Sequence, residues 1–212
     1  QAAEPIFVEG RRARSTPRGI PFTCPDITLN QYSVRAFNAI YFRRVPINGR
    51  ERTLSYQSFH HPLDRVVNWN RLYGRKGFLQ FQCVLPDESA RIGIRQMLER
   101  ISSVQAASFL GVLKTFGKEG LGDLSFPRSG VTLSLDIPVR HGGRELVEFL
   151  DALTLDHGGR VYLAKDATLT PDRFALMYPK LDKFRETLSI YDPTGVFDSD
   201  LAQRLKIRRG HQ

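Results

Sequence analysis

Two short segments with strict period-two alternation constrain this chain more than any other feature. Residues 77–85 (GFLQFQCVL) and 131–139 (VTLSLDIPV) place apolar side chains at odd positions and most of their polar side chains at even positions. Successive side chains of a strand point to opposite faces of a sheet, so both segments are expected to be strands with one buried face. The chain must therefore fold around a sheet that has an apolar side and a mixed side.

Helical patterns follow each of these strands. Apolar residues fall near helical spacing over 87–104, just after Pro86, and again over 143–157, which Gly158 and Gly159 end in the manner of a C-cap. Further strands are expected at 108–116 and 160–164. The order strand, helix, strand, strand, helix, strand is that of the ferredoxin-like split βαβ arrangement.

The predicted fold class is therefore α+β: an antiparallel sheet with helices on one face, followed by a short, mainly helical C-terminal segment. The first and third of these strands are expected to be the inner ones. At the other end, residues 1–24 are expected to be an irregular basic lead-in because glycine and proline punctuate them. Residues 36–42 (AFNAIYF) have the aromatic content of a strand, and a second short strand is expected near 53–57.

Composition excludes several classes of protein. Hydrophobic residues make up 41% of the chain, and there are 14 Phe and 7 Tyr, which excludes a wholly disordered chain. Two cysteines, Cys24 and Cys83, exclude a disulfide-stapled scaffold. No signal peptide and no run long enough to cross a membrane is visible in these residues.

The net charge of +9 points to an acidic partner. Arginines cluster at residues 11–18, and arginine and lysine cluster at residues 204–209. Such ends are commonly solvated tails, and they also suit a phosphate group or an anionic membrane surface. Nucleic acid is not expected, because the clusters are not interleaved with aromatic residues and no nucleic-acid motif is present.

The face of the sheet opposite the helices is the candidate site. A sheet face with glutamine, threonine and serine can simply face water. Here, however, amide, hydroxyl and ammonium groups are mixed with apolar side chains, which suits a hydroxylated, partly apolar ligand. The side chains expected on this face are Gln80 and Gln82 from the first strand, Leu110, Val112 and Lys114 from the second, and Thr132 and Ser134 from the third.

Motifs of familiar chemistry are mostly missing. His60 and His61 are adjacent in sequence, so they lack the spacing of a metal pair, and no metal site is expected. Asp64 and Asp136 are candidate paired carboxylates, but nothing in the sequence places them together. Lys165 stands at the end of the last expected strand, a place from which side chains often reach an active site, although the pattern alone favours a structural or solvated lysine.

Taken together, a series of motifs resembles one family. In order and spacing they are His61-Pro62-Leu63-Asp64, Trp69-Asn70-Arg71, Tyr73-Gly74, Gly77–Gln82, Ser108-Phe109-Leu110 with Lys114, Phe116 and Gly117, Leu124–Pro127, Ala164-Lys165-Asp166, Met177-Tyr178-Pro179, Asp192-Pro193, Val196-Phe197 and Ser199-Asp200. Over roughly residues 55–205 the chain resembles the C-terminal part of FAD-linked oxidases of the vanillyl-alcohol-oxidase type, in the branch that oxidises a polyprenyl-phosphoryl ribose.

The resemblance implies a division of the chain and a chemistry. Residues 25–163 would be a cap, or substrate-binding, domain, and 164–212 would be the C-terminal segment of an FAD-binding domain whose N-terminal half is absent. The implied reaction oxidises a secondary hydroxyl of a sugar to a ketone by hydride transfer to the flavin. The resemblance also implies a bacterial protein that is either cytoplasmic or periplasmic and membrane-associated. This chain alone is expected to bind FAD weakly or not at all and to be inactive.

The resemblance also assigns roles to residues. Lys165 would lie near both flavin and substrate as a catalytic and cofactor-binding residue, and Lys114 would hydrogen-bond the reacting hydroxyl or attract the substrate's phosphate. The other substrate-binding residues would be His60, Gln80, Gln82, Leu110, Val112, Thr132 and Ser134. Three of these depart from the family, which has tyrosine in place of His60, asparagine in place of Thr132 and cysteine in place of Ser134. A different class also fits: a non-catalytic sugar- or phosphate-binding module that has lost flavin.

Overall fold

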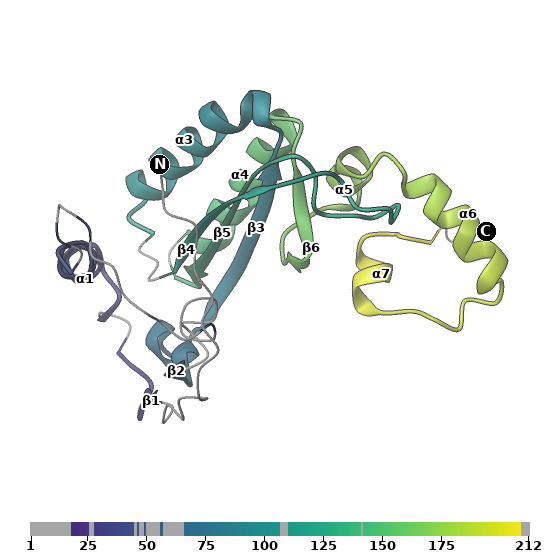
Figure 1. The fold of residues 1–212 in the computed structure, drawn as a ribbon. Coiled ribbons are helices and arrows are strands. Elements are labelled where there is room, and N and C mark those ends of the chain that lie inside the picture. The colour runs from purple at the N-terminus through teal and green to yellow at the C-terminus, as the bar shows by residue number, and fades with distance from the viewer. Residues whose placement is uncertain are drawn as a thin grey trace.

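The sheet predicted from the alternating segments forms the centre of the molecule. The structure is a computed structural model that describes residues 18–25, 28–44, 46, 49, 56, 66–106, 110–140 and 142–208. Its sheet has four strands in the order β4-β5-β3-β6, all antiparallel (Figure 1). The strands are β3 (Phe78–Leu85), β4 (Gly111–Phe116), β5 (Gly130–Pro138) and β6 (Arg160–Asp166).

Two helices cover one face of this sheet, as the sequence predicts. Helix α3 (Asp87–Ser103) follows β3, and α4 (Gly143–Asp156) follows β5. Chain order and strand order together give the split βαβ arrangement, with β3 and β5 inside, so the α+β prediction is confirmed. The turn after α4 needs glycine, because Gly158 has a φ of +66°.

The core lies between the helices and the odd-numbered side chains of the inner strands. Phe81 and Cys83 of β3 are completely buried, as is Leu150 of α4, and Met97 of α3 packs in the same cluster. A shift of one residue in the strand register would turn every side chain to the other face of the sheet. Because the odd-numbered side chains are buried under the helices, the even-numbered ones must lie on the opposite face.

The N-terminal region differs from the prediction. Residues 36–42, expected to be a strand, belong to helix α1 (Gln31–Phe42), which begins at a capping box formed by Asn30 and Ser33. Within the predicted irregular lead-in, β1 (Arg18–Gly19) pairs in parallel with β2 (Val66–Val67). The strand expected near 53–57 lies largely outside the described residues.

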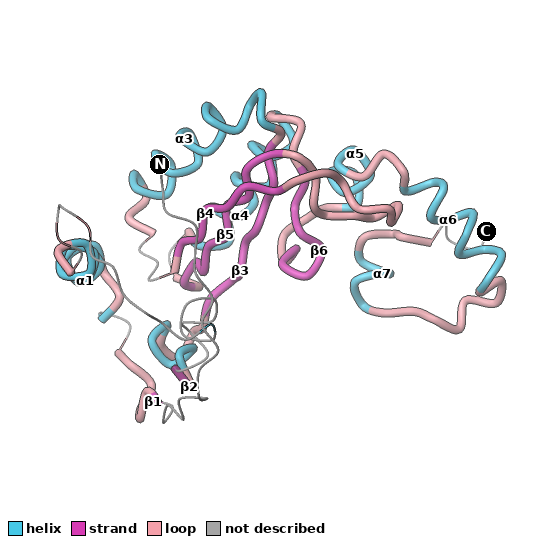
Figure 2. Tube along the Cα trace, viewed as in Figure 1, coloured by secondary structure: helices cyan, strands magenta, loops and turns pink. Residues whose placement is uncertain are grey.

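The C-terminal segment is mainly helical, as predicted. Its helices, which follow the last strand of the sheet, are α5 (Pro171–Met177), α6 (Leu181–Tyr191) and α7 (Asp200–Arg204). A short 3-10 helix, η3 (Trp69–Tyr73), lies before the first strand of the sheet. Figure 2 shows these last helices beyond the β6 side of the sheet. Phe174, Tyr178 and Leu205 share the buried cluster of the sheet and its helices, so the segment packs on the sheet domain. The proposed domain boundary at 163/164 falls within β6.

Candidate functional site

Strand pairing brings the predicted site residues onto one face of the sheet. Ser134 of β5 stands opposite Gln82 of β3 on one side and Val112 of β4 on the other. Lys114 stands opposite Thr132. Directly paired residues of antiparallel strands project to the same side, so these five side chains share the face that α3 and α4 leave open. We call this face, with Gln80, Asp136 and Lys165 added below, the polar sheet face.

Lys165 joins this face from the edge strand β6. Its Nζ donates a hydrogen bond to Ser134 Oγ at 2.9 Å. The ammonium is half-buried, and this desolvation lowers the pKa of Lys165, an effect that the nearby Asp136 carboxylate opposes and the Lys114 ammonium reinforces. An ammonium held partly out of water beside polar partners is suited to bind an anionic or carbonyl oxygen.

Asp136 is the second charged group of the face and was not predicted as a functional residue in its own right. Only 1% of its side chain is exposed, and it accepts hydrogen bonds from Gln80 Nε2 at 3.0 Å and from the Tyr73 hydroxyl at 3.4 Å. Burial raises the pKa of Asp136, and the bond from Gln80, the charge of Lys165 and the bond from Tyr73 oppose that rise. The carboxylate therefore fixes the orientation of the Gln80 amide.

Thr132 has a supporting position. It is 1% exposed, and its Oγ1 accepts a hydrogen bond from Gln82 Nε2 at 3.1 Å. Because the amide nitrogen of Gln82 is held by Thr132 and that of Gln80 by Asp136, both amides are oriented by residues of β5. The half-buried Gln80 and Gln82 thus have side-chain amides of fixed orientation on the same face as Lys165.

Aromatic side chains close both ends of the polar sheet face. At one end Phe78 packs against Tyr73, with ring centroids 4.5 Å apart, and against Trp69 at 5.1 Å. At the other end Phe126 packs against Tyr162 at 4.7 Å and Phe116 at 5.8 Å. The face is therefore a strip of polar groups between two apolar ends, which matches the mixed character predicted for it.

Hydrogen bonds and ion pairs hold the loop between β4 and β5 at the Phe126 end of the polar sheet face. Buried Arg160 donates from Nη1 to Glu119 at 2.7 Å and to the Ser125 carbonyl at 2.6 Å. Lys183 of α6 pairs with Asp123 of the same loop at 3.0 Å. These bonds link the loop to the sheet and to the C-terminal helices, so the aromatic end of the face has a fixed position.

The other residues predicted for the site lie at its edge or outside the described residues. Leu110 immediately precedes β4, and Lys114 is exposed on that strand. His60 lies outside the described residues, as do His61 and Asp64, so the pairing of Asp64 with Asp136 is not tested. The signal that could have identified Asp136 is its even position in residues 131–139, which puts it on the same face as Ser134.

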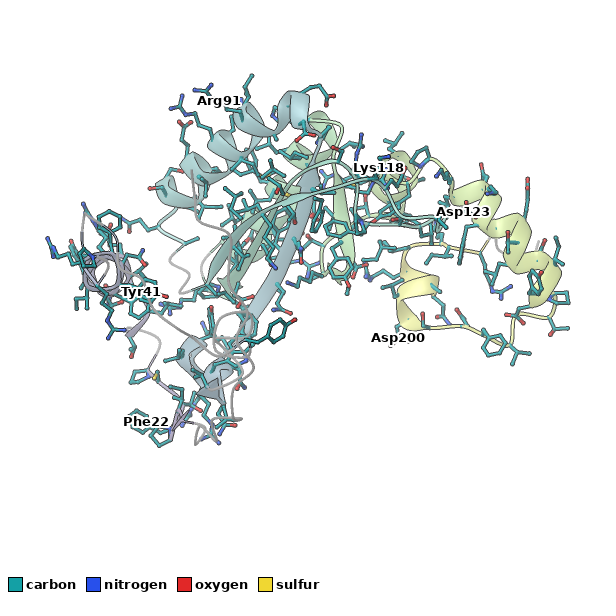
Figure 3. The ribbon with its side chains drawn as sticks, viewed as in Figure 1. Phe22, Tyr41, Arg91, Lys118, Asp123 and Asp200 are labelled. Carbon is teal, nitrogen blue, oxygen red and sulfur yellow. The ribbon has the colours of Figure 1, made fainter. Side chains whose placement is uncertain are left out.

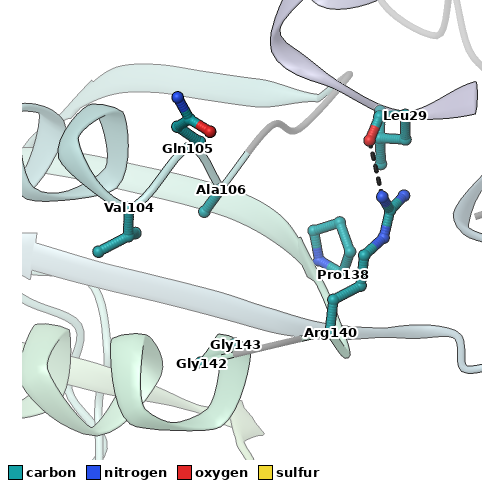
Figure 4. A pocket seen from close by; sticks show the side chains of 8 residues that line it. All are labelled: Leu29, Val104, Gln105, Ala106, Pro138, Arg140, Gly142 and Gly143. Carbon is teal, nitrogen blue, oxygen red and sulfur yellow. Dashed lines mark hydrogen bonds between the residues drawn. The ribbon is translucent and has the colours of Figure 1, made fainter. Parts of the chain in front are cut away.

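One hollow among the described residues lies away from the polar sheet face. It has a volume of about 60 Å³ and lies between the end of α3, the end of β5 and the start of α4. Figure 4 shows the residues that line it, which are Leu29, Val104, Gln105, Ala106, Pro138, Arg140, Gly142 and Gly143. Within the described part of the chain, no group of three or more potential metal-ligating side chains is present. Among those residues, too, no helix has the length and apolar character required to span a bilayer.

Known proteins show similarity to nearly all of this chain. The family model for D-arabinono-1,4-lactone oxidase matches residues 143–205. The chain is 36% identical over 188 residues to the decaprenylphosphoryl-β-D-ribose oxidase of Mycolicibacterium smegmatis, a match that covers 89% of this chain and 40% of that protein. It is 33% identical over 190 residues to an uncharacterised protein in the mprA 5′ region of Streptomyces coelicolor, covering 89% of this chain and 51% of that one. The chain thus spans about half the length, or less, of these relatives.

Proposed function

We propose that this chain belongs to the FAD-linked oxidases and supplies the substrate-binding face of a flavin-dependent oxidase that converts a secondary sugar hydroxyl to a ketone. The observation that carries the proposal is the position of Lys165. Its half-buried ammonium lies on the polar sheet face with Ser134, within electrostatic reach of Asp136 and Lys114. Residues of two strands, β4 and β5, therefore surround one cation that comes from a third strand, β6.

The donor set of the polar sheet face fits FAD and a sugar. An ammonium held over the polar sheet face suits the carbonyl edge of the isoalloxazine ring, where negative charge develops on reduction. When bound, FAD would supply the oxidising power that the side chains of this chain lack. In this chain Lys165 is the residue that would hold the flavin. The oriented side-chain amides of Gln80 and Gln82 would orient sugar hydroxyls.

The substrate is proposed to be a polyprenyl-phosphoryl ribose or a closely similar phosphorylated sugar. The Mycolicibacterium smegmatis relative carries the name of such an oxidase. On this chain, Lys114 is the exposed cation beside Thr132, and it would attract a phosphate or hydrogen-bond a hydroxyl. Val112 and Leu110 would form the apolar wall, and His60 would complete the set. The replacement of the family's cysteine by Ser134 leaves a hydroxyl that already accepts from Lys165.

The division of labour along the chain is part of the proposal. Residues 25–163 would form the cap domain, and 164–212 would return to the FAD domain, whose larger part would come from polypeptide outside this sequence. The packing of Phe174 and Tyr178 on the core supports close contact between the two proposed parts. The chain by itself would then lack most flavin contacts.

The test is to express the protein that contains this chain together with any segment encoded upstream in the same reading frame. We expect it to purify with FAD and its flavin absorbance to be bleached anaerobically by a polyprenyl-phosphoryl ribose. Arg91→Gln on α3 provides a control that should leave both properties unchanged. A protein that remains colourless after reconstitution with FAD, yet binds the phosphorylated sugar, would instead be a non-catalytic binding module.

A further inference from the structure

We propose that Arg204 of α7 is a positioning residue for Lys165, and that it acts by fixing the turn at the end of β6. Its Nη2 donates to Asp166 Oδ2 at 2.6 Å, and its Nη1 donates to the Leu169 carbonyl at 3.1 Å. Asp166 directly follows Lys165 in the chain. Figure 3 labels Asp200, where α7 begins, on the β6 side of the sheet. The inference rests on the proposed function, because it concerns the reaction that Lys165 would assist.

The strand pairing around Lys165 is irregular. Phe81 pairs with Asp166, and Cys83 pairs with Val161. One residue of β3 lies between these two pairs, whereas four residues of β6 do, and Lys165 is the last of these four. A regular ladder of hydrogen bonds cannot match four residues with one, so the longer strand bulges away from its neighbour. Pairing with β3 therefore does not by itself determine where the backbone of Lys165 stands.

The turn that ends the bulge is held by side chains from two helices. The Leu169 amide donates to the Asp166 carbonyl at 3.2 Å, which closes the turn. Within it, Thr168 donates to the buried Asp151 of α4 at 2.5 Å. Arg204 contacts the first and the last residue of the turn, and its bond to the Asp166 carboxylate is charge-assisted. The end of the bulge, and with it the start of the Lys165 side chain, is therefore fixed from outside the sheet.

Arg204 has a fixed starting point of its own. Helix α7 begins at Ser199, whose Oγ accepts the Ala202 amide, and it ends just before Leu205, which is completely buried. Leu205 and Ile207 belong to the core cluster, so the end of α7 cannot move freely. The Arg204 side chain is nevertheless 41% exposed, and an ion pair with so exposed a partner contributes little to stability. A positioning role therefore predicts a loss in rate that is large beside the loss in stability.

Arg208 offers a matched control in the same segment. Like Arg204, it bonds to one buried carboxylate and to one carbonyl, in this case both of Asp192. The Asp192 carboxylate also accepts the backbone amides of Val196 and Phe197, so these bonds join the end of α6 to the loop before α7. The chemistry of the two arginines is the same, but only Arg204 contacts the turn that carries Lys165.

The first experiment measures anaerobic flavin reduction by a polyprenyl-phosphoryl ribose, in the flavin-loaded protein that contains this chain. Arg204→Met should slow reduction about 10- to 100-fold, because a displaced ammonium no longer meets the reacting groups. Arg204→Lys should restore part of the rate, and Arg208→Met should stay within about two-fold of wild type. Lys165→Met combined with Arg204→Met should be within about two-fold of Lys165→Met alone, because no ammonium then remains to be positioned.

The second experiment follows Lys165 without turnover. Acylation of its amine by acetic anhydride, measured by mass spectrometry across a range of pH, reports the pKa of Lys165 in the protein without substrate. Burial is the largest influence on this pKa and lowers it. Release of the side chain into water in Arg204→Met should therefore move the midpoint of labelling to higher pH, whereas Arg208→Met should leave it in place.

The outcomes separate this inference from the proposed function. A Lys165→Met rate close to that of wild type would contradict both. A slow Lys165→Met beside an Arg204→Met of wild-type rate would overturn the positioning role alone, as would losses that multiply in the double variant or an unchanged midpoint of labelling. Thermal melting establishes that each variant is folded. If Arg204→Met does not fold, Asp166→Asn replaces it, with an expected loss in rate of about ten-fold, and a wild-type rate there would overturn the inference.

Discussion

Lys165 reaches Ser134 across an intervening strand. Lys165 belongs to β6 and Ser134 to β5, and β3 lies between them, yet Nζ and Oγ are 2.9 Å apart. The lysine side chain therefore crosses β3 to reach Ser134, whose cross-strand partner on β3 is Gln82. This arrangement places the ammonium above the centre of the polar sheet face and not at the solvated edge of the sheet.

Removing the Ser134 hydroxyl tests whether this contact positions the ammonium. Ser134→Ala deletes one hydrogen bond to a half-buried lysine, whose head group can still reach water. We expect kcat/KM to fall about three- to ten-fold, with a change in the free energy of unfolding of at most about 1 kcal/mol. Steady-state kinetics and denaturant titration of the flavin-loaded protein measure both. Ser134→Thr, which keeps a hydroxyl, is the control, and unchanged kinetics in the alanine variant would argue against a positioning role.

Asp136→Asn tests the electrostatic link between the two charged groups of the face. The Asp136 carboxylate raises the pKa of Lys165, so its removal should lower that pKa further. If the ammonium form of Lys165 is needed for turnover, the alkaline limb of the kcat/KM profile should move to lower pH. A limb that stays in place, or moves to higher pH, would contradict the link.

The same substitution has a consequence for stability. The pKa of Asp136 is raised in the folded state, mainly by burial, so stability is greatest where the carboxyl is protonated in both states and is lost as pH rises through the folded-state pKa. Asp136→Asn should remove this loss of stability, and the asparagine side-chain oxygen can still accept the hydrogen bond from Gln80. Thermal melts across acidic pH would show a flatter profile than wild type. Asp156→Asn, on the exposed side of α4, should leave the profile unchanged.

Asp151 provides a separate prediction, away from the site. It is 1% exposed, accepts a bond of 2.5 Å from Thr168 Oγ1, and its Oδ1 lacks a hydrogen-bond partner in the described part of the chain. Burial raises its pKa to about 6. The folded state therefore holds a proton that the unfolded state releases between about pH 4 and 6, and the free energy of unfolding should fall as pH rises through this window.

Asp151→Asn should remove that fall. At pH 7 the variant should be more stable than wild type by about 1–3 kcal/mol, and at pH 4 the two should be nearly equal. Urea titrations at the two pH values give the difference directly. A variant that is destabilised equally at both pH values would show that the carboxyl is needed for its bond to Thr168 whatever its charge.

The alternating pattern was sufficient to predict the sheet and its polar face, because register is fixed wherever one face is buried. Gln82, Ser134 and Val112 lie together for this reason. The strand expected at 36–42 was wrong because aromatic content indicates only that a segment is apolar. The local signal that decides the structure is the capping box of Asn30 and Ser33, which precedes the segment and starts a helix.

Other parts of the site required the tertiary structure. The role of Asp136 depends on Tyr73, which is 63 residues away in the sequence, and a single even-numbered aspartate gives no sign of that contact. The reach of Lys165 depends on β6, whose pairing with β3 contains a register shift between Phe81 and Cys83. Such an irregularity changes where a side chain points and is not visible in a period-two pattern.

The most direct test of the account is the rate at which substrate bleaches the bound flavin in Lys165→Met. The variant should bind FAD with the same stoichiometry as wild type, because most flavin contacts are proposed to lie elsewhere. Its rate of anaerobic flavin reduction, measured by stopped-flow absorbance, should fall about 100- to 1,000-fold because the oriented cation is lost, and Lys165→Arg should retain part of the rate. A Lys165→Met rate within about two-fold of wild type, at unchanged flavin content, would contradict the assignment of the polar sheet face as the active site.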